Sequence, residues 1–186
     1  MSGPVPGLLD PARTALLVID VQLAFARVMP DFEGLAERCA RMADVGAALE
    51  LPIFATEQYP RGLGATAPVL RTALRDVVVE SKTSFSSLGC DGVRAGLQGG
   101  GVRQVLVCGV ETHVCVLQTV HELLAAGLEP HVLADCVLSR NEVDRTHALE
   151  RMARAGAVVT TSEAAAFELL RDAEHPSFKQ IQQMFL

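Results

Sequence analysis

The residue whose type and position best suit chemistry is Cys115, which comes six residues after an apolar run at 104–109. If Thr112 caps the helix that follows, Cys115 lies in its first turn, where unpaired N–H groups and the helix dipole favour a thiolate. The same N–H groups could hold the oxyanion that forms when sulfur attacks a carbonyl. Cys115 is therefore the candidate nucleophile. The alternative is a buried structural cysteine, which we expect for Cys39 and Cys108, whereas the sequence assigns no role to Cys90 or Cys136.

Two charged residues stand at the ends of other apolar runs. Asp20 closes the run that starts at Thr14, and Lys82 follows the run at 77–80. Ligands of open α/β sheets bind beyond the carboxyl ends of the strands, so these side chains are expected near Cys115. Taken alone, Asp20 could equally be a strand-end residue that caps a turn, and Lys82 an ordinary surface lysine.

Together the three residues form a plausible catalytic set. Cys115 would attack, Asp20 would accept the thiol proton and return it later, and Lys82 would stabilise the charged forms. A cysteine–histidine arrangement through His113 or His121 stays open. His113, two positions before the cysteine, would point away from it on a helix, and His121 lies nearly two turns further along.

The pattern of apolar residues predicts the elements that hold this set. Short apolar runs alternate with longer stretches of helical period, which is typical of parallel strands joined by crossover helices in an α/β domain. Strands are predicted at 14–20, 51–56, 77–80, 104–109, 130–134 and 157–160. Helices are predicted at 32–49, 67–75, 92–98, 112–126, 142–155 and 163–171.

A few residues predict where helices begin and end. Gly127 suits a helix C-terminus, and Asn141 and Ser162 are candidate N-caps. Pro176 would lie in the first turn of a terminal amphipathic helix whose apolar side carries Phe178, Ile181 and Phe185. That helix would pack on the domain or on a second subunit.

Composition narrows the class of protein. The 186 residues are 49% hydrophobic, which supports one large-cored domain over residues 1–186, with residues 1–11 as a flexible start. A formal net charge of -6 argues against nucleic acid as a partner, because a phosphate backbone would be repelled. No apolar run is long enough to span a membrane, no export or transit signal is visible, and the five cysteines are odd in number, so we expect free thiols and a cytoplasmic location.

Three segments resemble the isochorismatase-like cysteine hydrolases, a family that includes nicotinamidases and N-carbamoylsarcosine amidohydrolases. The first is Leu17-Val-Ile-Asp-Val-Gln with Phe25 shortly after, and the second is Ser81-Lys-Thr-Ser-Phe-Ser. The third is Val107-Cys-Gly-Val-Glu-Thr-His-Val-Cys-Val-Leu-Gln-Thr. The resemblance extends over about residues 14–170 and has the segments in the family's order and spacing.

This resemblance implies a three-layer α/β/α sandwich, Rossmann-like, around a six-stranded parallel sheet, and a homo-oligomer. It also implies that Asp20, Lys82 and Cys115 are the catalytic triad. A cis peptide bond between Val110 and Glu111 would aim the amide of Glu111, with that of Cys115, into an oxyanion hole. Substrate-binding candidates, each of which could instead serve only in packing, are Gln22, Phe25, Tyr59 and Val110.

The chain also departs from the family pattern. Metal-binding nicotinamidases carry an Asp-x-His pattern after the second strand, where this chain reads Thr56-Glu-Gln-Tyr-Pro, so neither a metal nor another cofactor is expected. A nucleophilic cysteine favours a small amide or ureido substrate that is hydrolysed through a thioester. The alternatives are a vinyl ether hydrolase of isochorismatase type, in which the thiol is dispensable, and a catalytically silent binding or assembly module.

Overall fold

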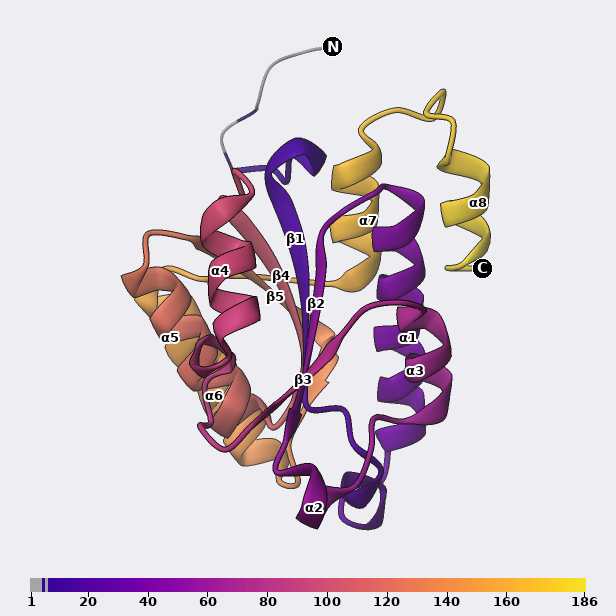
Figure 1. Ribbon diagram of the computed structural model, residues 1–186. Coiled ribbons are helices and arrows are strands. Elements are labelled where there is room, and N and C mark those ends of the chain that lie inside the picture. Colours follow the sequence, from indigo (N-terminus) through magenta and orange to yellow (C-terminus); the bar gives the residue numbers. More distant parts are fainter. Residues whose placement is uncertain (1–4, 6) are drawn as a thin grey trace.

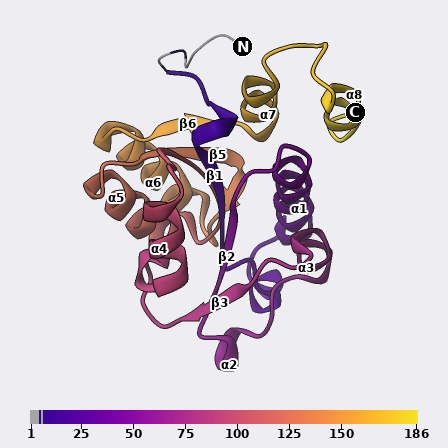
Figure 2. The same ribbon diagram turned by 45° about the horizontal axis from the view of Figure 1, so that its top comes forward.

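A sheet of six parallel strands forms the centre of the computed structural model, which describes residue 5 and residues 7–186 (Figure 1). The strands are β1 (Thr14–Ile19), β2 (Ile53–Gln58), β3 (Val79–Lys82), β4 (Gln104–Val110), β5 (Glu129–Leu138) and β6 (Val158–Thr160). Their order across the sheet is β3-β2-β1-β4-β5-β6, so β1 and β4 lie in the middle and β3 and β6 at the edges (Figure 2). The predicted α/β class with a six-stranded parallel sheet is confirmed.

The central strand β1 shows why its sequence is apolar at every position from Ala15 to Ile19. All six of its residues are buried, because helices cover both faces of the sheet. Leu16 and Val18 contribute to the core on one face, whereas Leu17 and Ile19 contribute to the core on the other. Alternate side chains of a strand point to opposite faces, so one continuous apolar run supplies two cores.

Two helical layers enclose the sheet. Figure 1 shows α4, α5 and α6 on one face and α1, α3, α7 and α8 on the other, with α2 at the end of the sheet where β2 finishes. The bounds are α1 (Phe32–Ala48), α2 (Pro60–Leu63), α3 (Pro68–Leu74), α4 (Asp91–Gly99), α5 (Leu117–Ala125), α6 (Glu142–Ala155), α7 (Ser162–Leu170) and α8 (Phe178–Gln183). Shorter turns are η1 (Pro11–Arg13), η2 (Leu23–Arg27), η3 (Ser87–Gly89) and the π-turn η4 (Thr112–Val116). This arrangement is the three-layer α/β/α sandwich that the resemblance implied.

Three predicted strands end at clearly different residues in the structure. β5 continues to Leu138 rather than ending at Ala134. β2 continues to Gln58 rather than ending at Thr56, and β3 runs from Val79 to Lys82 rather than from Val77 to Glu80. Both strands finish in polar residues, and a prediction based on apolar content stops too early there. The difference matters because Gln58 and Lys82 are register partners at the functional end of the sheet.

Three predicted helix starts need correction. Thr112 is the first residue of η4 and Glu111 is its cap, so Thr112 does not cap the helix. The cap of α7 is Thr161, whose hydroxyl accepts from the amide of Ala164, whereas the hydroxyl of Ser162 bonds Asp135. Asn141 does occupy the cap position of α6, but its amide donates to Asp144 rather than capping the backbone.

The two ends of the chain also differ in part from expectation. The terminal helix α8 starts at Phe178, after Pro176, but its predicted apolar side is confirmed: Ile181 is buried and its aromatic neighbours pack against the core. Of the stretch predicted to be flexible, residues 1–4 and 6 lie outside the described part. Leu9 is fully buried, and its amide donates to Glu168, so flexibility does not fit residues 9–11.

Gly109 allows the two central strands, β1 and β4, to approach each other closely at their carboxyl ends. Its φ is 121°, and a Cβ atom there would lie 2.0 Å from the backbone oxygen of its register partner Ile19. Only glycine combines that conformation with such a close approach. The ends of β1 and β4, which carry Asp20 and lead to Cys115, are thereby brought together.

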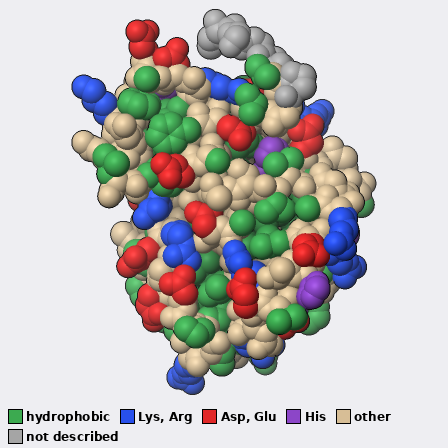
Figure 3. Space-filling view, turned by 180° about the vertical axis from the view of Figure 1, so that it is seen from behind, with side chains coloured by type: hydrophobic (Ala, Val, Ile, Leu, Met, Phe, Trp, Pro, Cys, Tyr) green, Lys and Arg blue, Asp and Glu red, His purple; other side chains and the backbone are tan. Residues whose placement is uncertain are grey.

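The surface is mixed in charge. On the face shown in Figure 3, acidic and basic side chains are interspersed with apolar ones. Over residues 5 and 7–186, none of the helices has the length and apolar character needed to cross a bilayer.

Candidate active site

Asp20 lies at the carboxyl end of β1 and is completely buried. Its φ of 55° turns the chain sharply out of the strand, a conformation that aspartate tolerates better than most residues. One carboxylate oxygen, Oδ1, accepts from the Thr56 hydroxyl at 2.7 Å, and the other, Oδ2, accepts from Lys82 Nζ at 2.6 Å. The carboxylate is therefore fixed in position and has a cation beside it.

Lys82 is as deeply buried as its partner. The side chains of Lys82 and Asp20 are 1% and 0% exposed, respectively, so the two form an ion pair away from water. Besides Asp20, Nζ donates to Gln58 Oε1 at 2.8 Å and to the backbone oxygens of Phe85 and Ser84 at 2.9 and 3.3 Å. Every one of these neighbours is an acceptor, which suits an ammonium group. The interpretation of Lys82 as a surface lysine is excluded.

Thr56 and Gln58, which hold this ion pair in place, were not predicted from the sequence. Gln58 accepts from Lys82 and donates through Nε2 to the backbone oxygen of Thr83 at 2.9 Å. Thr56 donates to Asp20 and lies 3.2 Å from the Ser87 hydroxyl. Thr56 and Gln58 are two positions apart on one strand, so a strand predicted to run to residue 58 would have placed both on one face at the sheet's functional end.

Cys115 reaches this region from the η4 turn. The amide of Val116 bonds the carbonyl of Glu111 at 3.2 Å, which gives the wide turn characteristic of a π-helix. The Thr119 hydroxyl donates to the carbonyl of Cys115 at 2.7 Å and accepts from the Ser87 amide at 2.9 Å. The cysteine's backbone is thus tied to the η3 turn, which also contacts Thr56.

The thiol of Cys115 is only slightly accessible, with 6% of the residue exposed. Burial, followed by the negative charge of Asp20, raises its pKa from 9.0 to about 12, while Lys82 acts in the opposite direction. The expectation that the helix terminus favours a thiolate is therefore wrong for the resting protein. A protonated thiol instead faces a buried carboxylate and a buried ammonium.

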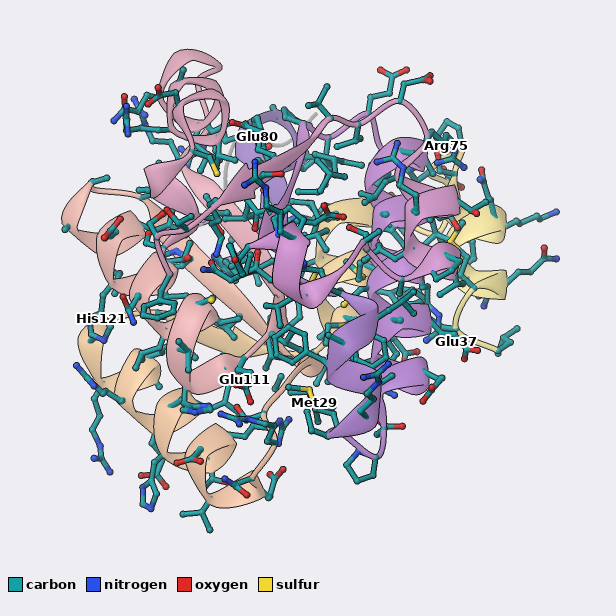
Figure 4. The ribbon with its side chains drawn as sticks, turned by 60° about the horizontal axis from the view of Figure 1, so that its bottom comes forward. Met29, Glu37, Arg75, Glu80, Glu111 and His121 are labelled. Carbon is teal, nitrogen blue, oxygen red and sulfur yellow. The ribbon has the colours of Figure 1, made fainter. Side chains whose placement is uncertain are left out.

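Glu111 links the start of the η4 turn to the loop before α6. The peptide bond between Val110 and Glu111 is cis. The Glu111 carboxylate accepts from both the backbone amide and Nε of Arg140 at 3.0 Å. In Figure 4, which brings this end of the sheet forward, Glu111 lies between the two helical layers. The backbone amides of Glu111 and Cys115 lie on this same turn and remain the candidates for an oxyanion hole.

The four predicted substrate-binding residues have different surroundings. Gln22 is fully buried, and its amide group bonds the backbone of Gln58 and Gly64, so its polar atoms hold the chain rather than face a ligand. Val110 is also fully buried in the core, and Phe25 is partly buried against it. Tyr59 is 54% exposed and borders a pocket of about 490 Å³. That pocket is lined by Tyr59, Pro60, Arg61, Ser81, Lys82 and Thr83.

The remaining reactive groups are less suited to catalysis. His113 Nδ1 lies 3.0 Å from the Ser139 hydroxyl, and His121 Nε2 is buried without a partner among the described residues, so neither histidine is placed by these contacts to serve Cys115. All five cysteines are free thiols. Burial raises the pKa of Cys90 to about 11. In the part of the chain that the structure describes, no group of three or more His, Cys, Asp or Glu side chains is arranged to hold a metal ion.

The fold and the site together define a three-layer α/β/α protein with a cysteine, an aspartate and a lysine at the carboxyl ends of its parallel strands. Comparison with known proteins identifies the family. Residues 14–164 match the isochorismatase domain model. The chain therefore belongs to the isochorismatase family and is an isochorismatase-family hydrolase domain, as the resemblance of its three segments implied.

Individual relatives agree with this assignment. Isochorismatase domain-containing protein 2 of Xenopus laevis is 39% identical over 181 residues, covering 97% of this chain and 87% of the relative. The structure of the MAR1 ribonuclease from Caenorhabditis elegans is 38% identical, with a TM-score of 0.91 over 96% of this chain and 92% of that one. The YcaC gene product of Escherichia coli is 23% identical, with a TM-score of 0.84 over 99% and 98% of the two chains, and shares the fold.

Proposed function

We propose that the protein is a cysteine-dependent hydrolase of a small amide or ureido compound, with Cys115 as nucleophile. The observation that carries this proposal is the buried ion pair of Asp20 and Lys82, whose members are the charged groups that act on the Cys115 thiol. A protonated nucleophile next to a fixed carboxylate is the arrangement that general-base catalysis requires.

The proposed reaction has two halves. As Cys115 Sγ bonds to the substrate carbonyl carbon, the thiol proton passes to the Asp20 carboxylate, and the carbonyl oxygen gains the negative charge. Backbone amides of Glu111 and Cys115 would receive that oxygen. When the C–N bond breaks, Asp20 returns the proton to the departing nitrogen, which leaves a thioester. Water then attacks the thioester, Asp20 accepts a proton from that water, and the carboxylic acid is released as Cys115 regains its proton.

Lys82 has a supporting role in this scheme. Its ammonium is already bonded to Asp20 and to three other acceptors, so it is not free to donate a proton to the substrate. It instead holds the Asp20 carboxylate in place before the reaction, and stabilises the negative charge that develops around the sulfur.

A panel of small primary amides and ureido compounds, assayed by ammonia release, tests the proposal. Cys115→Ala and Cys115→Ser should lose turnover by about 10³-fold or more while the proteins stay folded, as judged by circular dichroism and thermal unfolding. Cys90→Ala is the matched control, because Cys90 is also a buried free thiol and should be dispensable. Turnover retained by both Cys115 variants would contradict the proposal.

Hydrolysis of a vinyl ether is the first competing activity, because the family model that matches this chain is the isochorismatase domain. In that reaction Asp20 would act as the acid-base group without covalent chemistry at sulfur. Pyruvate release from isochorismate by wild type and by Cys115→Ala separates the two activities. Release that survives the loss of the thiol, together with inactivity toward amides, would favour the vinyl ether reaction.

Cleavage of RNA is the second competing activity, because the Caenorhabditis elegans neighbour is described as a ribonuclease. We rank it lower because the net charge of -6 repels a phosphate backbone and the lysine at the site is already paired with Asp20. Incubation of a labelled single-stranded RNA with wild type and Asp20→Asn decides this point. Cleavage by the wild type that the variant lacks would move this activity to first place.

A homo-oligomeric assembly is part of the proposal. The Escherichia coli YcaC neighbour is described as an octameric hydrolase of unknown specificity. Light scattering of the purified chain at several concentrations measures its mass, and a monomer at all of them would contradict this part. The cytoplasmic location stays a prediction from the sequence.

A further inference from the structure

Gln58 occupies a position that nothing in the proposed reaction uses. Four acceptors surround the ammonium of Lys82, and Gln58 supplies the only one that comes from an uncharged side chain; the others are the Asp20 carboxylate and two backbone oxygens. An ammonium group has three protons to share among them. The side chain at position 58 therefore shares the Lys82 ammonium with Asp20.

The orientation of the Gln58 amide is fixed by its partners. Lys82 can only donate and the carbonyl of Thr83 can only accept, so Oε1 must face Lys82 and Nε2 must face Thr83. The backbone of Gln58 is held as well, because the buried Gln22 side chain accepts from its amide at 2.8 Å and donates to its carbonyl at 3.0 Å. Contacts thus run from Asp20 to Lys82, from Lys82 to Gln58, and from Gln58 to Gln22. Gln22 is only two residues after Asp20 in the sequence, so the contacts form a nearly closed loop.

We propose that Gln58 is a positioning residue that holds the Lys82 ammonium against Asp20 while, being neutral, it leaves the charge of the pair balanced. One carboxylate and one ammonium cancel at the buried pair. A carboxylate in place of the Gln58 amide would add a second negative charge beside Lys82 and would lose the bond to Thr83. The extra charge would disfavour the thiolate of Cys115 and weaken the hold of Lys82 on Asp20.

None of the other titratable groups around the pair takes the place of the side chain at position 58 in setting the charge balance of the pair. Cys115 faces the ion pair from η4. Cys90, which directly precedes α4, is also within electrostatic reach of both Asp20 and Lys82. Glu80 on β3 accepts from the amide of Gly92, and Glu111 is paired with Arg140. Neither glutamate bonds Lys82 Nζ in the described structure, whereas Gln58 Oε1 accepts from it at 2.8 Å.

This inference rests on the proposed function, since it concerns the pair that activates Cys115. Its test uses alkylation by iodoacetamide, which needs no substrate. The rate of Cys115 modification is followed by peptide mass spectrometry from pH 7 to 10 in wild type, Gln58→Glu, Gln58→Met and Gln118→Glu. Gln118 is exposed on α5, so Gln118→Glu controls for one added negative charge elsewhere on the chain.

In Gln58→Glu the rate profile should move up by about one pH unit, which is about tenfold slower alkylation at a fixed pH. Gln58→Met, which is uncharged, and Gln118→Glu should stay within about threefold of wild type. Equal rates in Gln58→Glu and Gln58→Met, or equal slowing in Gln118→Glu, would overturn the proposal.

A second measurement covers the case in which the buried carboxylate of Gln58→Glu prevents folding. Gln58→Met keeps the size and neutrality of the side chain but removes the acceptor, so kcat on an amide substrate should fall by about tenfold or more with little change in KM. An unchanged kcat would overturn the positioning role. Failure of the proposed function gives a different result, namely turnover that survives in Cys115→Ala.

Discussion

Replacing Lys82 by methionine tests how much the buried ion pair contributes to the protein. Lys82→Met keeps the length of the side chain but removes the cation whose Nζ lies 2.6 Å from Asp20 Oδ2. The carboxylate would then be fully buried without a cation, although the Thr56 hydroxyl still donates to it. A buried charge that loses its partner cannot regain the hydration it gave up on folding.

The expected loss follows from the burial of both partners. Breaking a buried pair by removing one member costs about 3 to 5 kcal/mol, and burial of 99% or more on both sides places Lys82→Met in that range. A domain of this size is stable by about 5 to 15 kcal/mol, so the variant should fold but with a much lower margin. Asp20→Asn should also destabilise the protein, because the ammonium is then left buried.

The double variant Asp20→Asn/Lys82→Met buries neither charge. It should therefore be more stable, by about 2 kcal/mol or more, than the sum of the two single losses predicts. Urea unfolding of the four proteins measures this coupling, and Lys179→Met is the matched control because Lys179 is exposed. Strictly additive losses would refute the conclusion that the two charges depend on each other.

Three further predictions concern the frame around the site. Gly109→Ala should cost about 3 kcal/mol or more in urea unfolding, because its Cβ would lie 2.0 Å from a backbone oxygen at a positive φ, whereas Gly99→Ala, with open space around it, should be nearly neutral. Thr119→Val should cost about 1 to 3 kcal/mol, because it leaves the Cys115 carbonyl and the Ser87 amide without their shared partner. Since burial raises the pKa of Cys115 from 9.0 to about 12, the unfolded chain ionises first, and wild type should lose stability between pH 9 and 12 more steeply than Cys115→Ala. Parallel curves for those two proteins would contradict the raised pKa.

The fold was largely predictable because its signals are local. Continuous apolar runs such as β1 are required wherever a strand is covered on both faces, and the helical stripe of α1 is equally regular. The positions of Asp20, Lys82 and Cys115 followed from the same pattern, since the carboxyl ends of parallel strands meet at one edge. The structure does bring these three residues together.

The supporting residues could not be predicted in the same way. Gln58 and Lys82 are 24 positions apart, and Thr56 and Asp20 are 36 apart, so their contacts depend on strand order and register rather than on any local pattern. Polar residues at the ends of β2 and β3 also hid the true lengths of those strands. The family resemblance implied that Gln22 binds substrate, yet its side-chain amide bonds backbone groups of Gln58 and Gly64.

The protonation state of Cys115 has a consequence for the proposed reaction. The local expectation of a thiolate considered the helix terminus alone, whereas burial and the nearby Asp20 dominate in the folded chain. With its pKa raised in this way, the Cys115 thiol is mainly protonated near neutral pH. In the proposed reaction the proton therefore leaves the sulfur as the bond to carbon forms. Asp20 is the carboxylate fixed beside the thiol, and Lys82 and Thr56 hold it in the orientation in which it can accept that proton. The proposed activity would therefore depend less on the intrinsic reactivity of Cys115 than on the charge balance of the Asp20–Lys82 pair.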